Sequence, residues 1–575
     1  MKKSITFLFG LLLTSGLFAQ QYYDFLGSGH DRGITVTTSH NADDESNGDK
    51  SVDGFPIDDP VLLSDASRFL AQATMGYDYE TIQMAAAMGF EAWLDEQLAM
   101  PRTDFLGAMY RTQVDMGEGE DFGGFDLFLG TWWEMVLKSP ESLRQRIAYN
   151  LSQIMVVSGF GSDLFEDFGA LSVVYYNVLN RNAFGNYRTL LSEVSQNPSM
   201  GIYLSHYANP KSDPANNIHP DENYAREVMQ LFSIGLYELN NDGSQKLDAN
   251  GQVIPTYDND DIREFAKIFT GFGNGSPGGS WGTLEEGDAA EIALHPMKMY
   301  EEWHEQGEKK LLNGQIVPAG QTGIQDFEAA MDNLYNHPNV GPFIGKAMIQ
   351  FLVSANPSPA YIDRVATAFN SGPGGRGDMG AMIKAILLDE EARSCQPLQN
   401  PTSGKLREPV IRHMGFLKAF KPLLVEEPAI FFNREGEWYA NTGQMPMFAN
   451  SVFNFYQPTF QPNGPIAAQD LVAPVFQIHN SSTSVGFINQ VNKWTFGFAP
   501  FGYIPLQFDI VDEQELIEDD RALVERLNVL LACGQLSEST KNIIVNALSS
   551  TDIEEDKFNL ALYLILISPD YAILK

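Results

Sequence analysis

Apolar residues recur three and four positions apart along most of this 575-residue chain after Pro60. That spacing places apolar side chains on one side of an α-helix, because successive helical residues are about 100° apart. Segment 220–234 shows the pattern most clearly and has both a start and a stop signal. Pro220 and Asp221 suit a first helical turn, and Gly235 suits the position after the helix end. The chain is therefore predicted to be mainly α-helical.

The rest of the chain extends this prediction to a multi-helical globular fold with long irregular loops. Ser139 is expected to cap a helix that begins at Pro140. Segment 236–257 differs, since Asp242-Gly243 and Asn250-Gly251 favour tight turns and predict one or two small β-hairpins. A calcium-binding loop at 248–251 is the alternative there. Further helices are predicted at 62–100, 258–269, 324–336, 341–353, 359–369, 378–393, 518–533 and 539–568.

The first residues predict export from the cell. Lys2 and Lys3 precede an apolar run from Ile5 to Leu17, and the small residue Ala19 follows it. This order is typical of a signal peptide, expected over residues 1–20, and the run is too short for a transmembrane anchor. The protein is then periplasmic or extracellular. We expect a polar linker or disordered tail at 21–60 and one large helical domain at 61–575, with a sub-boundary within 395–430.

Charge and cysteine usage narrow the classes of function. The formal net charge is −37, so the surface should repel nucleic acid, whose binding depends on Lys and Arg replacing counterions on phosphates. The two cysteines, Cys395 and Cys533, exclude a cysteine-based metal site. In an exported protein they could form a disulfide or stay separate, and the sequence leaves both open.

The polar side chains of segment 220–234 lie on one side of the helical projection, opposite the bulky apolar ones. A solvent-facing surface is usually dominated by Lys and Glu, and this one is more varied. A polar pocket built on this helix is therefore one hypothesis. An ordinary surface pair at i,i+4 spacing is the alternative for Glu222 and Arg226. The polar side comprises Glu222, Asn223, Arg226, Glu227 and Gln230.

A second polar group, at 295–310, could complete such a pocket. In an enzyme, a carboxyl would act as acid or base, and an arginine would tune its pKa or bind an anionic group. A metal held by His219, His304 and a carboxylate is a further alternative, and the identity of any metal or cofactor is unknown. The candidate catalytic residues are Glu222, Arg226, Glu227 and His304, and the candidate substrate-binding residues are His219, Asn223 and Lys309.

Short motifs of the chain follow one another in a familiar order. Segment 221–227 is Asp-Glu-Asn-Tyr-Ala-Arg-Glu, and Leu231-Phe232 and Ile234-Gly235 follow it. With six other segments it resembles the bacterial family catalogued as domain of unknown function 1800. Here Phe272 stands where that family has Trp, and Glu305 where it has Asp. The other segments are Ala66–Gly76, Leu143–Arg146, Phe184–Arg188, Phe269–Phe272, His304–Lys309 and His337–Phe343.

The resemblance covers residues 62–575 and implies little about chemistry, because the family is named for its unknown function. It implies an exported protein and, as a partner, an exported protein similar to alkaline phosphatases and sulfatases. Three hypotheses follow. The chain is a hydrolase or lyase acting on extracellular or envelope material, or a non-enzymatic envelope binding or assembly protein that uses aromatic segment 431–460. In the third, the polar helix face is a structural network.

Overall fold

The computed structural model describes residues 57–115, 124–160, 163–284, 289–394, 400, 402–422, 438–497, 507–551 and 553–575. Helices dominate these ranges, and the strands within them are only two residues long. The prediction of a mainly α-helical fold is confirmed. The signal peptide, nearly all of the 21–60 tail and Cys395 lie outside the described residues, so export and the Cys395–Cys533 disulfide stay predictions.

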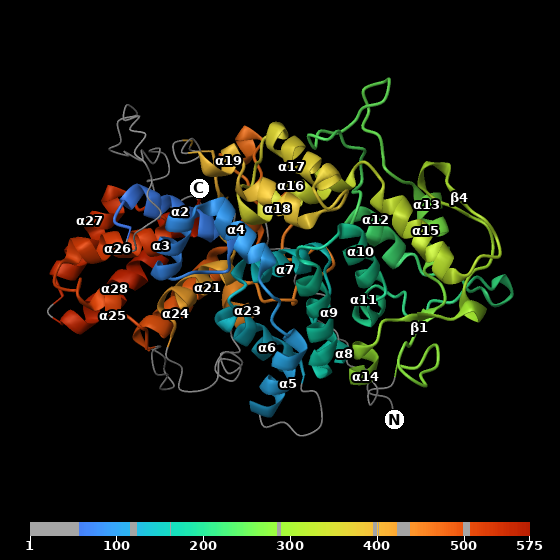
Figure 1. Ribbon diagram of the computed structural model, residues 1–575, viewed down its shortest axis with the longest axis horizontal. Coiled ribbons are helices and arrows are strands. Elements are labelled where there is room, and N and C mark those ends of the chain that lie inside the picture. Colours follow the sequence, from blue (N-terminus) through green and yellow to red (C-terminus); the bar gives the residue numbers. More distant parts are fainter. Residues whose placement is uncertain are drawn as a thin grey trace, which may run out of the picture.

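Helices recur from the beginning to the end of the described chain, with irregular segments between some of them (Figure 1). The first group is α2 (Pro60–Ala73), α3 (Tyr79–Met88), α4 (Phe90–Ala99), α5 (Phe105–Asp115), α6 (Phe125–Lys138), α7 (Ser142–Ile154), α8 (Asp163–Asp167), α9 (Gly169–Asn182), α10 (Tyr187–Ser195) and α11 (Pro198–Tyr203). The second is α12 (Asn223–Gln230), α13 (Asn259–Ile268), α14 (Ala289–Leu294), α15 (Gly323–Tyr335), α16 (Val340–Leu352), α17 (Pro359–Ser371), α18 (Met379–Leu387) and α19 (Glu390–Arg393). The third is α21 (Pro409–Phe420), α23 (Trp438–Thr442), α24 (Ser481–Phe496), α25 (Val511–Gln514), α26 (Asp520–Ala532), α27 (Glu538–Ser549), α28 (Glu554–Leu566) and α29 (Pro569–Ala572).

Short elements complete the described fold. Three antiparallel pairs of strands are β1 (Phe272–Gly273) with β2 (Lys298–Met299), β3 (Lys309–Lys310) with β4 (Ile316–Val317), and β5 (Lys405–Leu406) with β6 (Ile573–Leu574). The last pair ties the end of the chain to the segment before α21. Short 3-10 helices are η1 (Pro214–Asn216), η3 (Glu301–Trp303), η4 (Leu312–Gly314), η5 (Ala467–Gln469) and η6 (Pro474–Gln477).

Several predicted helices begin, end or divide elsewhere than expected. Segment 62–100 is divided among α2, α3 and α4, segment 378–393 between α18 and α19, and segment 539–568 between α27 and α28. The helix predicted to start at Pro140 starts at Ser142, and the backbone N–H of Ser139 instead ends α6 by donating to the Met135 carbonyl. Glu141 precedes α7 with its carboxylate bound to the backbone N–H and hydroxyl of Thr103. The helix predicted at 220–234 is regular only over 223–230, within α12.

Segment 236–257 forms two successive hairpins, as predicted. Antiparallel bridges join Tyr237 to Pro255, Leu239 to Gln245 and Leu247 to Val253. The two predicted turns carry glycines with φ of 78° at Gly243 and 76° at Gly251, a conformation that glycine adopts without steric cost. In the second turn the Asp248 carboxylate accepts the backbone N–H groups of Asn250 and Gln252, both at 2.8 Å.

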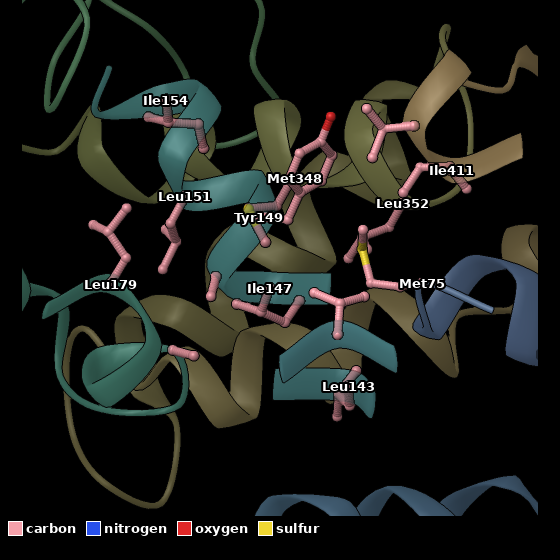
Figure 2. Packing of buried hydrophobic residues seen from close by; sticks show 14 of the residues in the cluster. Met75, Leu143, Ile147, Tyr149, Leu151, Ile154, Leu179, Met348, Leu352 and Ile411 are labelled. Atoms are coloured by element: carbon pink, nitrogen blue, oxygen red, sulfur yellow. The ribbon is translucent and has the colours of Figure 1, made fainter. Parts of the chain in front are cut away.

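Helix α7 lies in the middle of the molecule, near α4, α9 and α21 (Figure 1). Its predicted apolar stripe of Leu143, Ile147, Leu151 and Ile154 belongs to the main core, which also contains Met348 and Leu352 of α16 (Figure 2). The helix is buried around its whole circumference, from Leu143 to Ile154. Its polar residues are therefore buried as well, which periodicity alone does not predict.

Candidate functional site

The apolar side of α12 fixes the position of its polar side. The Tyr224 ring stacks on His206 at a centroid distance of 3.9 Å and meets Phe269 edge-on at 4.7 Å. The hydroxyl groups of Tyr224 and Ser195 are hydrogen-bonded at 2.6 Å. Buried aromatic contacts of this kind hold a ring in one orientation. The predicted helical phase is therefore right for the core-facing side chains.

The start and end of α12 are closed by local hydrogen bonds. Asp221 accepts the backbone N–H of Asn223 at 2.8 Å. At the other end the backbone N–H groups of Ile234 and Gly235 both donate to Met229, each at 3.0 Å, and Gly235 has a φ of 71°. The left-handed glycine ends the helical region as predicted, although the last regular turn stops at Gln230.

Part of the polar side of α12 faces solvent. Glu222 and Arg226 are each 40% exposed and form an ion pair at 3.4 Å. This is the surface-pair alternative that the sequence left open. Asn223 and His219 are exposed. Exposed pairs of this spacing stabilise a helix by only about 0.3–0.5 kcal/mol, so this pair matters little for the fold and keeps Arg226 at the surface.

Glu227 is the exception on this face, because its side chain is only 5% exposed. Its Oε2 atom is buried and has no hydrogen-bond partner among the described residues. Burial raises the pKa of this carboxyl above its ordinary value, and the positive charge of Arg226 partly opposes the shift. A buried carboxyl without partners is costly to keep ionised, so the site favours its protonated form more than water does.

Two tyrosines lie near the Glu227 carboxyl. The pKa values of Tyr203 and Tyr257 are both raised to about 12, mainly by burial and then by the negative charge of Glu227. The Tyr257 hydroxyl donates to Oε1 of Gln230, a residue on the same face of α12, at 3.2 Å. Tyr203 ends α11, and Tyr257 follows the second hairpin. No spacing rule connects either residue to α12, so sequence reasoning missed both.

His304 and Lys309 lie in a different place, around a buried carboxylate. Asp326 of α15 accepts hydrogen bonds at Oδ2 from His304 at 3.1 Å and from Lys309 at 2.5 Å, and at Oδ1 from Gln321 at 3.0 Å. Lys309 also donates to two backbone carbonyl oxygens, those of Glu305 and Gly307. In this buried cluster, each of the side chains of His304, Lys309 and Asp326 has a hydrogen-bond partner.

The two groups of predicted site residues are connected indirectly, through Asn209 and Thr270. The Asn209 side chain binds both the N–H and the carbonyl of Asp221, at the start of α12. The Asn209 carbonyl accepts the N–H of Gly271, and the carbonyl of Thr270 is hydrogen-bonded to Nδ1 of His304. Within the described residues, no hydrogen bond or ion pair joins Glu222, Arg226 or Glu227 to His304 or Lys309. The catalytic and substrate-binding roles predicted for these residues stay predictions.

The described part of the chain contains no group of three or more His, Cys, Asp or Glu side chains arranged to hold a metal ion. Each of its helices is too short or too polar to cross a bilayer.

The fold and the site define a mainly helical protein that carries a buried, unpartnered glutamate on a half-exposed polar helix face. The chain belongs to the family described as "Protein of unknown function (DUF1800)", whose family model matches residues 68–573. Neither a curated protein nor a solved structure matches the chain.

Proposed function

We propose that this chain is an exported hydrolase or lyase acting on extracellular or envelope material, with Glu227 as the group that transfers a proton. One observation carries the proposal: the Glu227 carboxyl is buried, has a raised pKa and keeps an oxygen without a hydrogen-bond partner within the described residues. A carboxyl that serves only to hold a fold has its hydrogen bonds satisfied. One that transfers protons needs a free oxygen and a pKa moved towards neutrality.

The residues around Glu227 support this role. Gln230 and Tyr257 are hydrogen-bonded to each other, and Tyr257 lies near enough for the Glu227 charge to raise its pKa. Arg226, the residue before Glu227, is half-exposed and presents a cation at the surface. In a strongly acidic protein a local cation is what would draw an anionic substrate group to this face. Hydrolysis and elimination both need a proton donor or acceptor at such a position.

In this proposal the buried cluster of His304, Lys309 and Asp326 takes no part in the reaction and instead holds the backbone next to the site in place. Lys309 holds the carbonyl oxygens of Glu305 and Gly307, and His304 holds that of Thr270. These contacts fix the segment that Asn209 links to the start of α12. Loss of the cluster would move the polar face rather than remove a reacting group.

The test compares variants of the mature chain, residues 21–575, on a panel of envelope and extracellular polysaccharides. Hydrolysis is followed as new reducing ends, and elimination as the ultraviolet absorbance of an unsaturated product. Glu227→Gln keeps size and removes the proton, so we expect a loss of about 10²-fold or more in rate. Glu222→Gln is the matched control, since it alters the exposed carboxylate on the same helix, and should retain most of the activity. Equal activity of Glu227→Gln and wild type would exclude this role.

Location and partner are part of the same proposal. Cell fractionation should find the processed chain in the periplasm or the medium. Affinity capture from that fraction should retain an exported protein similar to alkaline phosphatases or sulfatases. The resemblance of the motifs and the basic, then apolar, first residues support both expectations. Recovery of the unprocessed chain in the cytoplasm would contradict them.

The alternative, an envelope binding or assembly protein, relied on the aromatic segment 431–460. Residues 431–437 lie outside the described part of the chain. In the rest of the segment Phe455 and Tyr456 are buried, whereas Phe453 is 44% exposed. An interaction site normally needs several exposed apolar side chains in one patch. The described aromatics therefore favour packing over binding.

A further inference from the structure

Helix α7 carries a buried polar stripe on a different face from its apolar one. Arg146, Tyr149, Asn150 and Gln153 are spaced by three and four residues and so share one side of the helix. All four are at most 5% exposed. Figure 2 shows Tyr149 on this helix together with the apolar stripe. Polar stripes normally face solvent, so a buried one must be matched by polar groups from elsewhere.

Some of the hydrogen-bond partners of this polar stripe, and of the buried Glu408 beside it, come from residues far away in sequence. Glu408, just before α21, is fully buried and accepts hydrogen bonds at Oε1 from Tyr456 and from Gln444, the latter at 2.9 Å. Oε1 of Gln153 accepts the side-chain amide of Asn454 at 3.1 Å. Burial lowers the pKa of Arg146, and the negative charge of Glu408 partly opposes this shift, although the two side chains form no ion pair within the described residues. We call Arg146, Tyr149, Asn150, Gln153, Glu408 and Asn454 the α7 centre.

Both hydrogen-bond donors and hydrogen-bond acceptors of the α7 centre lack partners within the described residues. Among the described residues, eight buried atoms of these six side chains have no hydrogen-bond partner. Donor atoms outnumber acceptor atoms in this set, five to three. The three acceptors are Glu408 Oε2, Asn454 Oδ1 and Asn150 Oδ1. The five others are Arg146 Nε and Nη1, Tyr149 Oη, Asn150 Nδ2 and Gln153 Nε2. A bound molecule that satisfies this set must offer several oxygen acceptors and at least one hydroxyl donor for Glu408.

The charges around the α7 centre favour an anion. Arg146 Nη2 and Lys405 Nζ both donate to the carbonyl oxygen of Phe351, at 2.9 and 2.6 Å, which holds two basic groups beside a single carboxylate. Burial lowers the pKa of Lys405 to about 7, so this group can take up a proton when a negative charge arrives. A divalent cation would meet Arg146 and Lys405, and its ligand set would contain one carboxylate, that of Glu408.

We propose that the α7 centre binds a small hydroxylated organic acid of the sugar-acid class, with its carboxylate on Arg146 and Asn150 and a hydroxyl on Glu408. The site is closed in this structure, since the unpartnered atoms are all buried. Segment 444–456 contacts it through Gln444, Asn454 and Tyr456. The segment is fixed by hydrogen bonds from Gly159 to Met447 and from Ser158 to Ala449. Entry requires this segment to move, so the bound acid should exchange slowly. The proposal is independent of the role of Glu227.

The test uses native mass spectrometry of the mature chain, purified with D-glucuronate as the probe and then desalted. Wild type should carry one acid molecule per chain. Arg146→Gln removes the cation and should abolish the adduct. Arg144→Gln is the matched control, because Arg144 is a buried arginine on α7 about 160° away around the helix, bound to the Asn180 carbonyl. It should keep the adduct.

A second variant covers a failure of Arg146→Gln to fold. Asn150→Asp preserves size and places a negative charge where the acid's carboxylate is expected, so it should lower occupancy at least tenfold while circular dichroism stays helical. Wild type at its sequence mass alone would overturn the proposal and leave the α7 centre as an internal water network. An adduct retained by a folded Arg146→Gln or Asn150→Asp variant would overturn it as well.

Discussion

Asp326 and Glu227 are both buried carboxyl residues, 1% and 5% exposed, and they differ in what surrounds them. Asp326 accepts hydrogen bonds from a histidine, a lysine and a glutamine. Glu227 has an oxygen without a partner among the described residues and a pKa raised by burial. The first arrangement stabilises charge and rigidifies the fold. The second costs stability, which a protein tolerates where function needs it.

The α7 centre extends this comparison to a larger scale. An unsatisfied buried polar atom costs about 1–3 kcal/mol, and eight such atoms lie in this centre. Their sum would rival the whole stability of a typical domain, about 5–15 kcal/mol. A stable fold must therefore satisfy most of them with internal water or another bound molecule, whereas the side chains of His304, Lys309 and Asp326 satisfy one another.

Breaking the satisfied cluster should have the largest effect on stability. Asp326→Asn leaves the buried Lys309 ammonium without its counter-charge, and a broken buried pair costs about 3–5 kcal/mol. The measurement is equilibrium unfolding in denaturant at neutral pH, followed by circular dichroism. Asp332→Asn, on the same helix but 61% exposed and paired with Arg188, is the control. It should cost less than about 1 kcal/mol. Equal losses for the two variants would show that burial of the pair is irrelevant.

The next largest effect on stability should come from the protonation of His206 as the pH falls. Burial lowers its pKa from 6.5 to about 4, and its Nε2 is hydrogen-bonded to the Ser195 carbonyl. The unfolded chain binds this proton below pH 6.5 and the folded chain does not. Stability is therefore present above pH 6.5 and is lost as the pH falls towards 4, by about 3 kcal/mol at 1.36 kcal/mol per pKa unit.

His206→Gln removes this titration while keeping an amide that can donate to Ser195. The slope of unfolding free energy against pH should become shallower between pH 6.5 and 4 than in wild type. An identical slope in both proteins would mean that His206 does not resist protonation in the fold.

Glu227 should produce a smaller effect of opposite direction. Its folded-state pKa lies above the ordinary value of 4.5, so wild type is relatively most stable at low pH, where the carboxyl is protonated in both states. As the pH rises through the raised pKa, the folded state must ionise a buried group and loses stability. Glu227→Gln should therefore gain on wild type with rising pH in parallel melts at acid and alkaline pH. A gap that narrows with rising pH would refute the burial argument.

The exposed ion pair between Glu222 and Arg226 should contribute least to stability. Replacing Arg226 with glutamine removes an ion pair between two side chains that are each 40% exposed. The expected loss is about 0.3–0.5 kcal/mol, and it should shrink further in high salt. Unfolding measured at low and high ionic strength checks this. A loss of several kcal/mol would place Arg226 in a buried network instead.

The sequence predicted the fold class because helical periodicity depends only on neighbours along the chain. Tyr224 and Val228 were assigned correctly to the core side of α12 by this rule. Glu227 was assigned to the polar side, but it is buried in the fold, where its charge raises the pKa values of Tyr203 and Tyr257 from other elements. Asp326 and Glu408 had no signal at all, since an isolated acid in a sequence does not indicate which distant side chains approach it.

The start of α7 shows the same limit at a helix end. Ser139 and Pro140 are good start residues, so local preference favoured a helix from Pro140. A tertiary contact prevailed, because Glu141 binds Thr103, which lies before α5. Local rules thus locate helices to within a turn, and the residues that decide function lie where distant segments meet.

The most direct test of the distinction between satisfied and unsatisfied carboxyls is one experiment on two isosteric variants. Asp326→Asn and Glu227→Gln are unfolded in denaturant side by side with wild type at pH 7. We predict a loss of about 3–5 kcal/mol for Asp326→Asn and no loss, or a gain, for Glu227→Gln. A comparable loss in Glu227→Gln would contradict this account, because Glu227 would then be a stabilising part of the fold rather than a group held ready for chemistry.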